Sequence, residues 1–96
     1  MAEIPRPSRR FAANLRRLRG AVGLSQEELA FRAGIHRTQV SLLEGGGRLP
    51  RVVTLVKLAG GLGVTPNDLL DGIGWEPIET VRGGLVVTPT EDPRDA

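Results

Sequence analysis

Glycines divide the first two thirds of this chain into short segments, and this division is the strongest constraint on its fold. Gly23, Gly34 and the run Gly45-Gly46-Gly47 each follow a segment whose apolar residues recur at helical spacing. Glycine often ends a helix because it adopts the left-handed backbone conformation at low cost. The sequence therefore predicts an all-α domain built from short helices.

The first two helices are predicted from their apolar stripes and end signals. The first starts at Arg9, with Ser8 as its N-cap, and ends at Gly23. Its apolar stripe consists of Phe11, Leu15, Leu18 and Val22. The second follows Ser25, because Ser25 and Glu28 have the spacing of a capping box. Its buried stripe consists of Leu29, Ala30 and Ala33.

Three more helices follow before residue 72. One is expected from about Arg37 to Glu44, with Val40 and Leu43 facing inward. The next follows Pro50, and its inward side consists of Val52, Leu55, Leu58, Ala59 and Leu62. A short fifth helix opens at Thr65, because threonine is a good N-cap and proline suits the first helical position.

The composition changes after Gly72. Two β-prone runs, 75–82 and 85–88, are joined by Gly83-Gly84, which predicts a β-hairpin with a primed turn. The predicted organisation is a flexible arm over 1–8, a helical domain over 9–71, the β-prone tail over 72–88 and disorder over 89–96.

Charge is distributed unevenly along the chain. Residues 1–71 carry eleven Arg and Lys against six Asp and Glu, whereas residues 72–96 carry two against five. The net charge of +2 therefore combines a basic body with an acidic tail. A basic surface on a small domain favours a polyanionic partner, nucleic acid first.

Composition also excludes several classes of protein. The chain of 96 residues has no cysteine and one histidine, His36, so neither a disulfide nor a metal site or other cofactor is expected. The serines have only His36 as a possible base, so no enzyme is predicted. No apolar run reaches the roughly 18–20 residues that span a membrane, and the start lacks a secretory signal. These features predict a cytoplasmic protein.

The predicted second and third helices, joined by a tight glycine-containing turn, describe a helix-turn-helix motif. Over residues 9–71 the sequence also resembles the phage-repressor and Cro-like family, also called the xenobiotic-response-element type. The matching segments are Gly23 to Ala30, Ala33-Gly34-Ile35, Val40-Ser41, Glu44 to Pro50, Leu55 to Ala59 and Leu62-Gly63-Val64.

The resemblance implies a five-helix repressor-like bundle, here with a short C-terminal β-hairpin appendage, whose third helix lies in the DNA major groove. It assigns base reading to Arg37, Thr38, Ser41 and Leu42. It implies that Gln26 holds a phosphate and braces the third helix, and that Arg48 contacts the DNA backbone. Arg19 and Glu44 match a largely buried ion pair of the family.

The sequence departs from the family pattern in three places. His36 replaces the usual Ser, Thr or Asp cap of the third helix, Leu42 replaces a polar base reader, and the loop at 45–47 is unusually rich in glycine. We expect His36 to lie near phosphates. For Arg16 and Arg17, phosphate contact and a solvated helix face are both open.

These observations predict a sequence-specific regulator of transcription, a bacterial or phage repressor that binds a palindromic operator in double-stranded DNA as a homodimer. The alternative is an antitoxin that binds a toxin protein and regulates its own gene through the same motif.

The tail is the predicted dimer element, because a free two-stranded hairpin is marginal in water. Its candidate contact residues are Trp75, Ile78, Val81, Leu85 and Val87. The alternative is that the hairpin folds back on its own chain, over Phe31 or the fifth helix.

Overall fold

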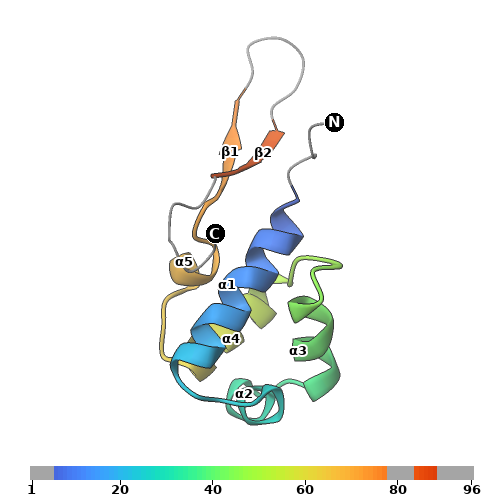
Figure 1. Cartoon of the computed structure of the whole chain (residues 1–96), viewed down its shortest axis with the longest axis vertical. Helices are drawn as coiled ribbons and strands as arrows, with labels where there is room; N and C mark the ends of the chain where they lie inside the picture. Colours follow the sequence, from blue (N-terminus) through green and yellow to red (C-terminus); the bar gives the residue numbers. More distant parts are fainter. Residues whose placement is uncertain (1–5, 78–83, 89–96) are drawn as a thin grey trace.

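The computed structural model describes residues 6–77 and 84–88, which form five helices followed by two antiparallel strands (Figure 1). This confirms the all-α five-helix bundle with a hairpin appendage. The elements are α1 (Pro7–Ala21), α2 (Gln26–Ala33), α3 (Arg37–Glu44), α4 (Val52–Leu62), α5 (Pro66–Leu69), β1 (Ile73–Glu76) and β2 (Gly84–Val87).

The end signals of α2 work as the sequence predicts. The Ser25 hydroxyl accepts the backbone N–H of Glu28, and the Glu28 carboxylate accepts the backbone N–H of Ser25. Gly34 ends the helix at φ 70°. The short helix α5 has the same device, because Thr65 and Asp68 also exchange both hydrogen bonds.

The predicted start of α1 is wrong by two residues. The helix begins at Pro7, so Ser8 lies inside it, and the side chain of the N-cap residue Arg6 makes no capping hydrogen bond. Proline suits this first position because its φ is already helical and it has no N–H that needs a partner. Pro7 and Ser8 therefore belong to the helical domain rather than to the arm.

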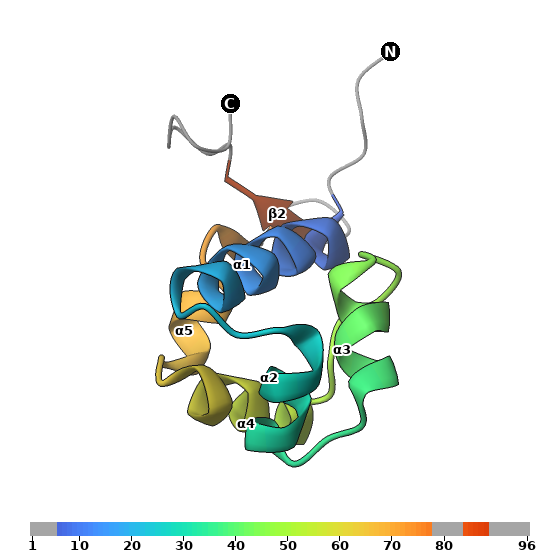
Figure 2. The same ribbon diagram turned by 60° about the horizontal axis from the view of Figure 1, so that its bottom comes forward.

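The core is aliphatic around one phenylalanine, as the composition predicts. Its largest fully buried apolar side chains are Phe11, Leu15, Leu29, Val40, Leu58 and Leu69. Helix α2 packs on both α3 and α4 (Figure 2). Two expected core positions are instead exposed: Val22 at the end of α1, by 47%, and Val52 at the start of α4, by 76%. Val52 lies in the first turn of α4, whereas the buried residues Leu58, Ala59, Gly61 and Leu62 all belong to the second half of the helix.

The hairpin forms, but its turn differs from the prediction. Ile73 pairs with Val87, and Glu76 pairs with Gly84. Gly84 is therefore a strand residue, and the connection runs over 77–83 rather than through a two-residue Gly83-Gly84 turn. The register leaves too many residues between the paired ends for a primed turn of that kind.

Two polar side chains of α1 hold the base of the hairpin. The Arg10 guanidinium donates to the carbonyls of Asp71, at 3.1 Å, and Thr88, at 2.8 Å. The fully buried Asn14 amide donates to the carbonyls of Leu69 and Asp71, each at 2.9 Å. The hairpin thus packs on its own chain, against α1 rather than over Phe31 or α5, and Figure 1 shows it beside the start of that helix.

Gly72 provides a direct test of this anchor. Its φ is 81°, and a Cβ atom there would lie 2.5 Å from Nη2 of Arg10. We expect Gly72→Ala to lower the free energy of unfolding more than Gly63→Ala does. Gly63 has a similar φ of 74° but open space around it, so its substitution costs only the left-handed strain of about 1–2 kcal/mol. Urea unfolding of both variants measures the difference, and equal losses would contradict the anchor.

Candidate nucleic-acid interface

Helix α3 presents a polar face to solvent. Val40 and Leu43 are buried against the core. The four predicted base readers, Arg37, Thr38, Ser41 and Leu42, are all exposed on the other side of the helix. The Leu42 side chain is 51% exposed, so this face offers an apolar surface as well as hydrogen-bonding groups.

His36 caps α3 in spite of its departure from the family pattern. Its ring nitrogen Nδ1 accepts the backbone N–H of Thr38 at 3.0 Å. An imidazole nitrogen thus replaces the usual side-chain oxygen, which requires that Nδ1 carries no proton. The exposed ring lies at the N-terminus of the helix, where anions are favoured.

The other end of α3 is fixed by Glu44. The Arg19 guanidinium donates to both carboxylate oxygens of Glu44, at 2.5 Å and 2.9 Å, which is a bidentate pair. The Gln26 amide donates to the same carboxylate at 3.0 Å. Arg16 donates to the backbone carbonyl of Glu44. The last residue of α3 is therefore bonded to both α1 and α2.

The carboxylate of Glu44 and the positive charges of Arg19 and Arg16 stabilise one another. Burial of the Glu44 carboxyl acts to raise its pKa. The hydrogen bonds from Arg19 and Gln26, together with the positive charges of Arg19 and Arg16, outweigh burial and lower the pKa. The hydrogen bond to Glu44 raises the pKa of Arg19 in turn. Glu44 is thus ionised at neutral pH despite a side chain that is only 5% exposed.

Arg16 and Arg17, for which the sequence gives the same expectation, make their contacts on different sides of α1. Arg16 reaches the end of α3, whereas Arg17 donates to Asn14 at 3.4 Å. Asn14 and Arg10 mark the side of α1 that holds the hairpin, one helical turn apart. Arg17 therefore lies on the hairpin side and is not brought together with the other predicted phosphate contacts.

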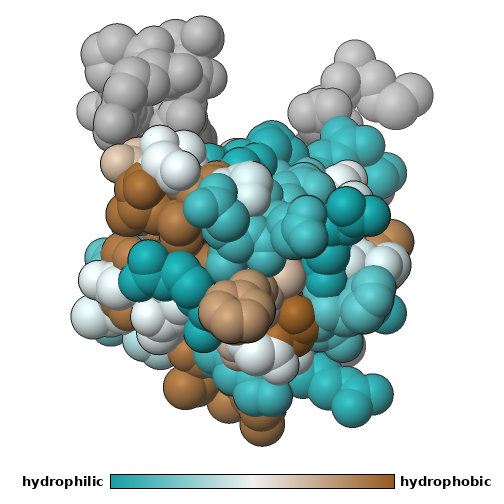
Figure 3. All heavy atoms as spheres, turned by 90° about the horizontal axis from the view of Figure 1, so that it is seen from below, coloured by the Kyte–Doolittle hydropathy of each residue, from teal (hydrophilic) through white to brown (hydrophobic). Residues whose placement is uncertain are grey.

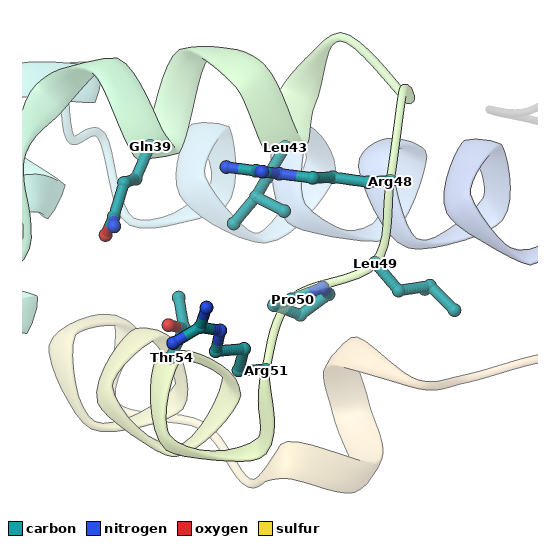
Figure 4. Close-up of a pocket in the computed structure, with 7 residues that line it drawn as sticks. All are labelled: Gln39, Leu43, Arg48, Leu49, Pro50, Arg51 and Thr54. Carbon is teal, nitrogen blue, oxygen red and sulfur yellow. The ribbon is translucent and has the colours of Figure 1, made fainter.

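A groove of about 400 Å³ lies between α3 and the start of α4. Figure 4 shows Gln39 and Leu43 of α3 on one wall, with Arg51 and Thr54 on the other and Arg48 extending along α3. Of these residues, Arg48 is predicted from the sequence as a contact to the DNA backbone, whereas Gln39, Arg51 and Thr54 are not predicted. Gln39 was detectable, since it lies three residues from both His36 and Leu42 and so shares the outward side of α3.

The two guanidiniums give this groove the character of an anion site. No acidic residue lines it, and Arg51 gives the first turn of α4 no side-chain cap. Backbone N–H groups at such a helix start favour anions. In Figure 3, the surface over α3, on the right of the view, is mainly hydrophilic. The base-reading candidate Arg37 has only a loose exposed contact with Glu27, at 4.0 Å.

The predicted dimer residues of the tail fall into three groups. Trp75 and Leu85 pair directly across the two strands and are 61% and 49% exposed. Val87 is half-buried. Ile78 and Val81 lie outside the described residues.

Two other kinds of site are not found in residues 6–77 and 84–88. No helix in this part of the chain is long and apolar enough to cross a membrane. No group of three His, Cys, Asp or Glu side chains is placed there to hold a metal ion.

The architecture and this surface define the class of protein. A family model described as helix-turn-helix, of the HTH_3 type, matches residues 15–69. The match spans more than half of the chain, and the chain therefore belongs to this Cro-like helix-turn-helix family. The resemblance described from the sequence is confirmed.

Relatives of this chain include regulators and control proteins. It is 41% identical over 68 residues to an uncharacterised HTH-type transcriptional regulator, y4dJ, of Sinorhizobium fredii, covering 71% of this chain and 88% of the relative. It is 40% identical over 62 residues to control protein C.BamHI of Bacillus amyloliquefaciens, covering 64% and 76%. The crystal structure of the restriction-modification controller protein C.AhdI from Aeromonas hydrophila is similar, with 44% identity, a TM-score of 0.62 and coverage of 65% and 94%.

Substitution of Arg19 should destabilise the fold more than substitution of its partner Glu44. Arg19→Met leaves a buried carboxylate without its cation, whereas Glu44→Gln leaves a guanidinium that is 22% exposed and can be hydrated. We expect Arg19→Met to cost up to about 3 kcal/mol, Glu44→Gln to cost less, and Arg19→Met/Glu44→Gln to cost less than Arg19→Met alone. Chemical unfolding of the four proteins gives the coupling energy, and additive losses would exclude the ion pair.

The lowered pKa of Glu44 makes stability depend on pH in a defined direction. The unfolded chain takes up a proton near the ordinary glutamate value of about 4.3, while the folded carboxylate resists it. The stabilisation is therefore complete above that value and is lost as the pH falls through it toward the folded pKa. The stability difference between wild type and Glu44→Gln should shrink as the pH falls from neutral through the ordinary glutamate value of about 4.3. A constant difference in thermal unfolding across this range would contradict the assignment.

Proposed function

We propose that this protein is a sequence-specific regulator of transcription that binds double-stranded DNA and reads the major groove with α3. One observation carries the proposal. The outward face of α3 is exposed and polar, while its C-terminal residue Glu44 is bonded to α1 and α2. A rigidly held helix with a free face is what entry into the major groove requires.

Base reading is assigned to Arg37, Thr38, Ser41 and Leu42. Arg37 is the long cationic side chain of this face and suits the N7 and O6 acceptors of guanine. Thr38 and Leu42 can pack on a thymine methyl group. Gln39, which the structure adds, suits the N6 and N7 groups of adenine.

Phosphate contacts are assigned to the surroundings of α3. Gln26 uses one amide hydrogen on Glu44 and has a second for a phosphate. Arg16 and His36 lie at the two ends of α3. Arg48 and Arg51 line the groove beside α4, where a DNA strand would meet two guanidiniums and the start of a helix.

We further propose that the protein acts as a homodimer on a palindromic operator. One domain carries one recognition helix and covers one half-site, and two half-sites a helical turn apart, about 34 Å, need two-fold symmetry. A dimer bound across a promoter would act as a repressor in the cytoplasm, associated with the nucleoid. Because C.AhdI is a restriction-modification controller protein, genes of such a system are a rational place to search for the operator.

The antitoxin alternative makes a different prediction about partners. An antitoxin would form a stable complex with a second small protein encoded beside it, and the exposed Trp75–Leu85 pair is a surface available for that contact. Co-expression of the chain with its neighbouring gene products and co-purification tests this alternative.

Base contacts and phosphate contacts can be separated by two substitutions. We expect Arg37→Ala to relax the preference at one base pair in each half-site, at a cost of about 1–3 kcal/mol for the preferred base. Arg51→Ala should weaken all sequences evenly and reduce the slope of log binding constant against log salt by roughly 1. Selection from a random DNA library, followed by salt titration of the selected site, measures both.

Arg17→Ala is the matched control, because it removes the same charge from the hairpin side of α1. Its salt slope should equal that of wild type. The same consensus for Arg37→Ala and wild type would refute the base assignment, and equal slopes for Arg51→Ala and Arg17→Ala would refute the phosphate groove.

A further inference from the structure

Helix α4 has an apolar outer face that the proposed DNA contacts do not use. Val52, Val53 and Val56 are 76%, 64% and 54% exposed. Gly60 continues this face, because positions 52, 56 and 60 are spaced by one helical turn each. Figure 3 shows hydrophobic side chains gathered at the lower edge of the view, over α4.

Two adjacent glycines of α4 differ in their surroundings. A Cβ atom at Gly61 would lie 3.1 Å from the backbone nitrogen of Ala33, so Gly61 allows α2 to approach. A Cβ atom at Gly60 would meet nothing within 4 Å. Glycine inside a helix is less favourable than alanine by about 1 kcal/mol. Nothing within the described chain therefore accounts for Gly60, whereas the close approach of another backbone would.

We propose that this face of α4, from Val52 to Gly60, packs against the same face of a second copy around a two-fold axis. The inference rests on the dimeric regulator proposed above and names its interface. In such a contact the three valines of each copy would be buried, and Gly60 would let the two helix backbones approach closely.

The small number of charged residues on this face of α4 supports a second copy of the chain as its partner. A two-fold contact places like residues of the two copies near one another, so charged groups at its centre would repel. Lys57 is the charged residue of α4, and it adjoins this face at its border. By contrast, the exposed Phe31 lies in a groove bordered by Glu27, Glu28 and Arg32, so a two-fold contact there would place three charged groups of each copy at the interface.

The position of the face also suits a dimer on DNA. The face starts at Val52, directly after Arg51 of the proposed phosphate groove. Because Arg51 points into the groove between α3 and α4 (Figure 4), a two-fold axis at the valine face places the phosphate grooves of both copies beside the contact rather than at its centre. The hairpin pair Trp75–Leu85 instead lies beside the start of α1 (Figure 1).

Disulfide trapping tests the contact directly, because the natural chain has no cysteine. In the otherwise intact protein, Gly60→Cys should form a disulfide-linked dimer under mild oxidation, since the bond needs Cα atoms within about 4.4–6.8 Å. Gly20→Cys is the matched control: Gly20 is also an exposed helical glycine with open space around it. Equal trapping at positions 20 and 60 would overturn the proposal.

Sedimentation equilibrium without DNA gives the affinity. Wild type should be a dimer at tens of micromolar (roughly the range for a modest interface). Gly60→Leu should raise the dissociation constant by roughly tenfold or more, while Gly20→Leu leaves it unchanged. Leucine is a better helix former than glycine, so circular dichroism should show that Gly60→Leu stays folded. A monomeric wild type, or a Gly60→Leu dimer of unchanged affinity, would overturn the interface.

The hairpin is the competing interface and has its own variant. Trp75→Ser/Leu85→Ser should remain dimeric if α4 forms the contact, and a monomer would assign the dimer to the tail instead. DNA binding is scored separately. A wild type that dimerises through α4 but selects no DNA sequence would refute the regulator and leave the interface standing.

Discussion

The bidentate pair between Arg19 and Glu44 is the interaction on which the orientation of α3 depends. Glu44 closes α3, and through this one carboxylate the helix is bonded to α1 and, by way of Gln26, to α2. A helix of eight residues has little stability of its own, so its direction is set by what holds its ends. One end is held by this cluster and the other is capped by His36. The outward face can therefore stay free of internal contacts without losing its orientation.

Helix ends could be predicted from the sequence because they depend on neighbouring residues. Contacts between residues far apart in the chain could not be predicted in the same way. The capping box at Ser25 and the N-cap signal of Thr65 followed by Pro66 predicted the starts of α2 and α5, because these signals depend only on neighbouring residues. The pair Arg19–Glu44 came from family resemblance rather than spacing. The hairpin turn was misplaced because strand register depends on which residues pack on α1, and two glycines alone do not encode it. The groove at α4 was missed for a related reason: Arg48, Gln39 and Thr54 meet only once the bundle has folded.

Counting charges along the chain does not show which arginines are bound within the fold. Arg10 is held by the Asp71 and Thr88 carbonyls, and Arg19 is held by Glu44 and the Leu24 carbonyl. Helix α1 thus has one polar side that fixes α3 and another that fixes the tail. The tail lies beyond the family match, which ends at residue 69. Asn14 nevertheless joins the two parts, because its buried amide binds the carbonyls of Leu69 and Asp71.

The glycine-rich loop after α3 turns the chain while it lies against α1. Gly46 has a φ of 79°, and a Cβ atom there would lie 3.4 Å from Cγ of Arg9 and 3.8 Å from Cβ of Ala12. These are ordinary contacts that place the turn against α1, and the left-handed φ is what favours glycine at this position. This turn leads directly to Arg48 and the start of α4. If the outer face of α4 is the dimer contact proposed above, the course of this loop helps to set the separation of the two α3 helices in the dimer.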